Sequence, residues 1–159
     1  MTTAPLGRPP VPPAVYELLE RSRATLEAAC RTSDASERYL DAHLGALRAA
    51  AALVAARTTP SPRSRPRSVW QVLPTIAPEL GEWATFFAGT ASRRAVVDRG
   101  GWLSAREADD LLRQAEMFLE IVQDQLGIPQ TVPLPDSITP VVGGRPAPTA
   151  SASSGGGWP

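Results

Sequence analysis

Apolar residues recur three and four positions apart over most of the chain, and polar residues fill the positions between them. This spacing is typical of amphipathic helices, and no useful stretch alternates as a half-buried strand does. The pattern predicts four long helices, at about residues 13–31, 34–57, 78–98 and 104–126, and a short helix that begins near Ser68. Gly127 and Pro129 supply a stop for the last helix. We therefore predict an all-α bundle of four long helices plus one short helix.

The second predicted helix carries the longest uninterrupted apolar pattern. Its large side chains alternate four and three residues apart, as in the seam between packed helices. Its many alanines favour the helix and permit a neighbouring helix to approach closely. We expect the following leucine stripe to face the bundle: Leu40, Leu44, Leu47, Ala51 and Val54.

The two ends of the chain have a different composition. Residues 1–12 and 128–159 are rich in Pro, Gly, Ser and Thr and poor in large apolar side chains, which predicts disordered tails on either side of one helical domain at 13–127. No apolar run reaches the roughly 18 residues of a membrane span, and the first residues lack the apolar core of a signal peptide. A single cysteine suits a reducing compartment. We expect a cytoplasmic protein that does not enter the membrane.

Composition excludes several kinds of chemistry. The formal net charge is zero, so bulk electrostatics favours neither nucleic acid nor membrane. All 16 basic residues are arginine, which excludes a P-loop lysine and a Schiff-base lysine. With one cysteine, Cys30, and one histidine, His43, no His/Cys metal cluster can form. Glu107, Asp109 and Asp110 lie in the first turns of a predicted helix, where the helix dipole favours acids. We expect no metal and no cofactor.

His43 is the one imidazole that could act as a general base near neutral pH, and Arg38 precedes it by five residues. On a helix this spacing separates two side chains by about 140°. The two side chains can border one groove only if a second surface, such as a dimer partner, covers the side of the helix between them. In the alternative interpretation, His43 fills the edge of the bundle and Arg38 is solvated near Asp34 or Asp41. Spacing alone favours this structural interpretation.

The stretch from Glu37 to Leu53 resembles an actinobacterial subfamily of the HEPN (higher eukaryotes and prokaryotes nucleotide-binding) superfamily. Further matching segments follow in the same order, at 69–70, 77–83, 86–87, 93–94 and 104–112, so the resemblance covers about residues 14–127. It implies a bundle of four to five helices that is often a homodimer. Many members are metal-independent endoribonucleases with an arginine, four to six residues and a histidine, and Arg38 and His43 match those positions. The resemblance implies that His43 moves the proton and that Arg38 holds the scissile phosphate.

A proline-rich loop at 58–67 adds a second candidate site. With the preceding residue it carries four arginines and no acid, and it is either a phosphate-binding flap or a solvated connector: Arg57, Arg63, Arg65 and Arg67.

Two functions therefore remain open. The first is an RNA-acting endoribonuclease that uses Arg38 and His43. The second is a non-catalytic helical dimer that binds a protein partner or a nucleotide. An open cleft shared by the two side chains from two copies would favour the enzyme. A buried His43 and an Arg38 tied to a surface carboxylate would favour the binding module.

Overall fold

The computed structural model describes residues 10–59, 61–63, 65–129 and 134–141. Over these residues the chain forms five α-helices, one 3-10 turn and no strand, which confirms the predicted all-α class. The elements are α1 (Pro13–Arg31), α2 (Ala35–Arg57), α3 (Val69–Ile76), the 3-10 turn η1 (Pro78–Leu80), α4 (Gly81–Asp98) and α5 (Ala105–Leu126).

The helix ends follow the local signals of the sequence. Asp34, Ser68 and Ser104 each accept a backbone N–H of the first helical turn, which satisfies a donor that the helix itself cannot. Gly127 ends α5 with a φ of 67°, in the left-handed region that glycine enters without strain. Pro74 does not end α3, which continues to Ile76.

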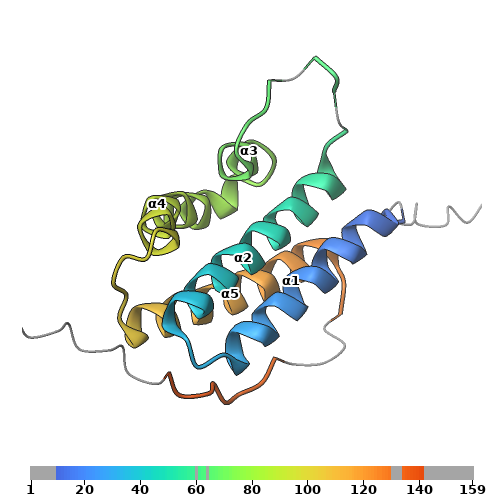
Figure 1. Ribbon diagram of the computed structural model, residues 1–159. Coiled ribbons are helices and arrows are strands. Elements are labelled where there is room, and N and C mark those ends of the chain that lie inside the picture. Colours follow the sequence, from blue (N-terminus) through green and yellow to red (C-terminus); the bar gives the residue numbers. More distant parts are fainter. Residues whose placement is uncertain (1–9, 60, 64, 130–133, 142–159) are drawn as a thin grey trace, which may run out of the picture.

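Helix α2 lies at the centre of the molecule. Helices α1 and α5 pack along it on one side, and α3 and α4 contact it on the other (Figure 1). The described residues between α2 and α3 form a loop that projects beyond the bundle (Figure 1). The bundle therefore positions every other helix against α2, the helix that carries both Arg38 and His43.

The face that α2 buries is not the leucine stripe. Its fully buried side chains are mainly alanines, including Ala42, Ala46 and Ala49, together with Leu53. The residues of the leucine stripe are only half-buried, and Leu40, Leu47 and Val54 pack against the core from its edge, so the stripe is the flank of the buried face and not its centre. Small side chains occupy the inner face because α1 approaches closely there: Ser22 on α1 donates a 2.7 Å hydrogen bond to a carbonyl of α2. At Gly45, the residue that accepts this hydrogen bond, even an added Cβ would lie 2.4 Å from Cδ2 of Leu26, so a larger side chain would not fit there.

Aromatic rings join the other helices to this core. Trp70 on α3 stacks on Phe87 of α4 with ring centroids 4.9 Å apart, and Phe118 of α5 lies 5.2 Å from Phe87. Trp83 adds a fourth ring, 5.6 Å from Phe118. Such pairs contribute roughly 0.5–1.5 kcal/mol each beyond their buried area. They fix α3 and α4 against the bundle at the level of His43, which is 6.4 Å from the Trp70 ring.

Residues 134–141, here called the strap, differ from the expected disordered tail. Leu134 and Ile138 pack against the core. The N–H of Thr139 donates a 2.9 Å hydrogen bond to the carbonyl of Cys30, at the end of α1. The strap therefore lies over the end of α1 and the start of α2. The remaining parts of the two predicted tails (1–9, 130–133 and 142–159) lie outside the described residues.

Candidate functional site

Arg38, the predicted phosphate ligand, lies in the first turns of α2 and its side chain is fully buried. Its Nε donates a 2.9 Å hydrogen bond to the carbonyl of Ala29, and Nη2 donates one of 2.6 Å to the carbonyl of Thr32. Nη2 also donates to the carbonyl of Thr139 in the strap. Nη1 forms an ion pair with Asp109 of α5. All three nitrogens of the guanidinium are therefore engaged within the chain.

His43, the predicted acid–base residue, is only 2% exposed. Its Nδ1 lies 3.0 Å from Oγ1 of Thr90 on α4. Because the Thr90 hydroxyl donates to the carbonyl of Phe87, it accepts from Nδ1–H, which leaves the lone pair on Nε2. Burial, helped by the charge of Arg94, lowers the pKa of His43 to about 4. The imidazole is therefore neutral at pH 7.

One chain does not bring these two side chains into a shared site. The partners of Arg38 come from α1, α5 and the strap, whereas those of His43 come from α3 and α4. This agrees with their angular separation on the helix. His43 is buried and Arg38 is tied to the half-exposed Asp109. This is the arrangement that favours a binding module over an enzyme.

Asp109 is a partner that sequence reasoning missed. Its position in the first turns of a predicted helix indicates only a favourable interaction with the helix dipole. It lies 71 residues from Arg38 along the chain. No local pattern signals a contact at that separation, because only the packing of α5 against α2 creates it.

The four arginines of the predicted phosphate site do not act together. Arg57 donates a 2.8 Å hydrogen bond to Gln125 and lies 3.7 Å from a carboxylate oxygen of Glu79, so it ties the end of α2 to its neighbours. The other three are exposed on the projecting loop. We call them the loop arginines: Arg63, Arg65 and Arg67. Phosphate binding by this loop stays a prediction.

A cleft of about 650 Å³ lies between α4 and α5, and sequence reasoning missed it. Arg93 spans it with two hydrogen bonds to Glu107, of 2.7 and 3.0 Å. This pairing holds the pKa of Glu107 below its usual value and raises that of Arg93. Tyr39, which directly follows Arg38, is buried at the cleft wall, where burial and then Glu107 raise its pKa.

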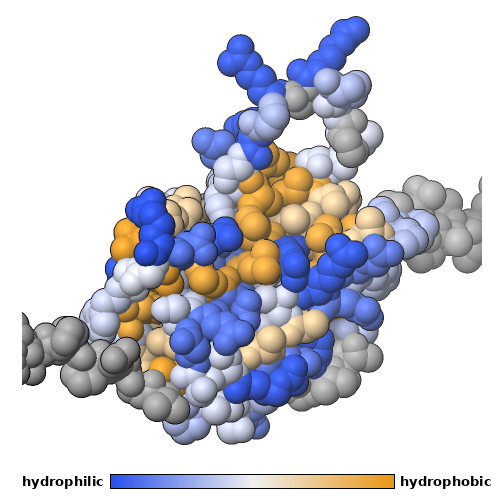
Figure 2. All heavy atoms as spheres, viewed as in Figure 1, coloured by the Kyte–Doolittle hydropathy of each residue, from blue (hydrophilic) through white to orange (hydrophobic). Residues whose placement is uncertain are grey.

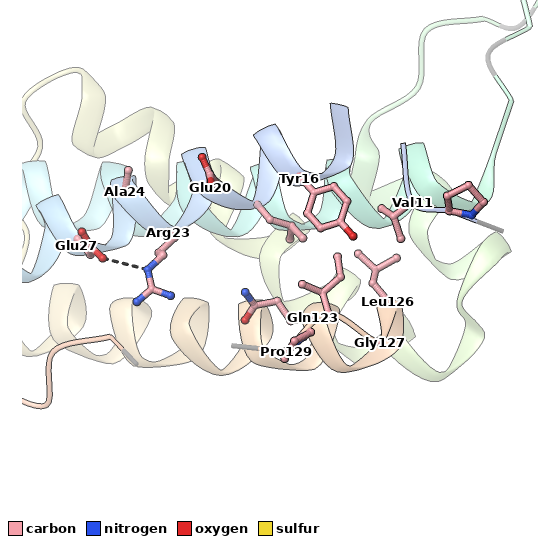
Figure 3. A pocket seen from close by; sticks show the side chains of 13 residues that line it. Val11, Tyr16, Glu20, Arg23, Ala24, Glu27, Gln123, Leu126, Gly127 and Pro129 are labelled. Carbon is pink, nitrogen blue, oxygen red and sulfur yellow. Dashed lines mark hydrogen bonds and ion pairs between the residues drawn. The ribbon is translucent and has the colours of Figure 1, made fainter. Parts of the chain in front are cut away.

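A further groove of about 750 Å³ runs between α1 and the end of α5. Tyr16 on α1 lies across it from Leu126 on α5 (Figure 3). At the other end Arg23 pairs with Glu27 at 3.1 Å (Figure 3). The groove contains neither Arg38 nor His43, so it adds nothing to the predicted ribonuclease site.

The described part of the chain contains no group of three or more His, Cys, Asp or Glu side chains placed to hold a metal ion. Nor does any of its helices combine the length and apolar character that a membrane crossing requires.

A family model described as HEPN_SAV_6107-like HEPN matches residues 29–123, more than half of the chain. The matched segment begins at the end of α1 and includes Arg38, His43, Asp109 and the loop arginines. Neither the curated proteins nor the solved structures contain a match.

Proposed function

Because the chain belongs to the HEPN family, we propose that it is a non-catalytic HEPN module that works by binding a partner, and that Arg38 and His43 stabilise its bundle. One observation carries this proposal. The guanidinium of Arg38 is fully buried, and its three nitrogens all donate to groups of the same chain.

Energetics argues against phosphate binding at Arg38. A phosphate would have to displace the carboxylate of Asp109 or the carbonyl of Thr139. Because the side chain of Arg38 has no exposed surface, the strap or α5 would have to move away, with loss of its contacts, before a phosphate could reach the guanidinium. The phosphate would also lose its hydration on entering a closed site. These costs oppose the ribonuclease function.

The state of His43 argues in the same direction. A general base works best when its pKa lies near the working pH. The pKa of His43 is lowered to about 4, so its neutral form is a weak base at pH 7 and its charged form is scarce. The ring is also enclosed by α3 and α4.

The predicted homodimer is part of the proposal. Leu40, Leu44 and Leu47 lie half-buried on α2, on the flank beside His43. Figure 2 shows apolar side chains gathered over α2 and its junction with α3. Residues with this four-three spacing pack well against a second helix with the same pattern. We propose that these three leucines meet those of a second copy.

Ribonuclease activity is tested by incubating the purified wild type with a broad set of RNAs in EDTA, beside His43→Gln and Arg38→Met. We expect no cleavage by any of the three proteins. Arg31→Met, at an exposed arginine of α1, is the matched control for a contaminating nuclease. Cleavage that the wild type and Arg31→Met perform, and that both site variants lose while still folded, would overturn the proposal.

The homodimer is tested by measuring the mass in solution over a range of concentrations. We expect twice the chain mass for the wild type and the chain mass for Leu44→Glu, because a carboxylate would be buried in the interface. Ala88→Glu, on the exposed face of α4, is the control and should remain dimeric. A monomeric wild type, or a dimeric Leu44→Glu, contradicts this interface.

A further inference from the structure

An apolar groove of about 520 Å³ lies where the start of α1, the end of α2 and α3 meet. Its walls are small and aliphatic, with Ala14 from α1, Ala55 from α2 and Val72 from α3. Arg67, the last of the loop arginines, lies at its edge. In Figure 2 the hydrophilic side chains of the projecting loop stand beside an apolar surface at the junction of α2 and α3.

The segment of the chain that supplies most of the groove's lining carries charge of one sign. Residues 42–78 contain five arginines and no Asp or Glu, although the whole chain has a net charge of zero. Two of the five arginines have partners within the chain, since Arg48 donates to Thr25 and Arg57 contacts Gln125 and Glu79. The loop arginines take part in no ion pair with any residue that the structure describes. The groove therefore combines an apolar floor with uncompensated positive charge.

We propose that the groove and the loop arginines together bind a segment of a partner protein that carries aliphatic side chains next to carboxylates. The concave floor with alanine walls accepts protruding aliphatic side chains. The guanidinium groups match carboxylates in planar, two-point geometry. The proposal gives the binding module a surface and a partner chemistry, so it rests on the function proposed above.

The lining of the groove favours a peptide over RNA. Single-stranded RNA is held by aromatic rings on which its bases stack. The residues that line this groove include no aromatic side chain. Arginines alone would hold an RNA only through its phosphates, without using the apolar floor. A peptide with aliphatic and acidic side chains uses both halves of the surface.

The test measures fluorescence anisotropy of a labelled peptide with the full-length protein. The probe is a peptide of about four helical turns, with leucine at every third or fourth position and Glu or Asp elsewhere. One control peptide carries Gln and Asn in place of the acids, and a second carries Ser in place of the leucines. We expect the acidic leucine peptide to bind, and each control to bind at least about tenfold more weakly. Added salt should weaken binding of the acidic peptide.

Two variants locate the binding on the protein. Ala55→Glu places a carboxylate on the groove wall, and the triple variant Arg63→Gln/Arg65→Gln/Arg67→Gln removes the positive charge. Each should weaken binding by at least about tenfold. All four positions are exposed, so the bundle should fold as before. The matched controls are Ala95→Glu on α4 and Arg31→Gln on α1, which should bind as the wild type does.

Several results would overturn the proposal. They are no binding of the acidic leucine peptide, or equal binding by the wild type and both groove variants. Preferential binding of an RNA oligomer or of anionic vesicles would assign the arginines to phosphate. A loss of dimer mass in Ala55→Glu would show that a second copy fills the groove. RNA cleavage that depends on Arg38 and His43 would refute the non-catalytic function alone, because peptide binding is measured separately.

Discussion

At the scale of single residues, the buried imidazole of His43 couples folding to pH. Its pKa is about 4 in the folded chain, whereas an imidazole in an unfolded chain has a pKa of about 6.5. As the pH falls below about 6.5 the unfolded state takes up a proton that the folded state excludes. The contribution of His43 to the free energy of unfolding is therefore full above that pH. It should fall by about 3 kcal/mol as the pH approaches 4.

Urea unfolding of the wild type and of His43→Gln over this pH range checks the prediction. The Gln amide keeps a hydrogen-bonding group beside Thr90 but does not titrate. His43 is the only histidine, so the difference between the two proteins reports this one group. Parallel pH profiles would contradict a buried neutral imidazole.

Arg38 should be one of the most costly residues to replace. Arg38→Met leaves Asp109 and the carbonyls of Ala29 and Thr32 without their buried donor. We expect the free energy of unfolding to fall by about 1–3 kcal/mol at neutral pH, because the buried carbonyl of Ala29 is left without a donor. Arg93→Met is the control, because both side chains of its ion pair with Glu107 are about one third exposed and screened by solvent, so this change should cost much less. Similar losses in the two variants would show that Arg38 is an ordinary surface arginine.

At the scale of helices, the sequence predicts where each element begins and ends better than which face it buries. The caps at Asp34, Ser68 and Ser104 are local, because donor and acceptor lie within one turn. Which face of α2 is buried depends instead on contacts with other helices. Leucine is more apolar than alanine, so the pattern predicts that the stripe is the core face, yet the most buried side chains of α2 are mainly alanines, where α1 approaches closely. The periodicity of apolar residues does not specify how closely two helices approach each other.

Gly45 tests that close approach directly. A Cβ added there would lie 2.4 Å from Cδ2 and 2.7 Å from Cγ of Leu26 on α1. Alanine is the better helix former by about 1 kcal/mol, but the clash should outweigh this gain. We expect Gly45→Ala to lower the free energy of unfolding by about 1–3 kcal/mol.

Gly89→Ala, on α4, is the matched control in the same denaturation measurement. A Cβ at Gly89 meets no other atom within 4 Å, so this change should stabilise the protein by up to about 1 kcal/mol. A stabilising Gly45→Ala would contradict the packing of α1 on α2.

At the scale of the whole molecule, the sequence predicts one helical domain but not the strap. The residues at 134–141 have no helical or strand period, and only Leu134 and Ile138 pack against the core. They are held instead by groups far away in sequence, the side chain of Arg38 and the carbonyl of Cys30. Contacts between distant segments also determine what Arg38 and His43 do. A motif identifies Arg38 and His43, but their partners, and hence their roles, depend on contacts between distant segments.

The last prediction follows from the contact between Arg38 and the strap. A chain that ends at residue 133 should be less stable than one that ends at residue 141. The shorter chain loses the two hydrogen bonds of Thr139, the exposed hydrogen bond from Arg113 to the carbonyl of Asp136, and the packing of Leu134 and Ile138. Each hydrogen bond contributes about 1 kcal/mol and each half-buried aliphatic side chain a similar amount, offset by the entropy of a free strap. We expect a net loss of about 2 kcal/mol on these grounds, measured by chemical denaturation.

The same truncation in Arg38→Met distinguishes a strap held by Arg38 from one held by apolar packing alone. If the guanidinium holds the carbonyl of Thr139, the truncation should cost less in Arg38→Met than in the wild type, by about 0.5–1.5 kcal/mol. Equal costs would mean that the strap and Arg38 are energetically independent. In that case Asp109 and the carbonyls of Ala29 and Thr32 would hold the guanidinium without the strap. A positive coupling would instead make the strap part of the network that keeps this arginine closed to phosphate.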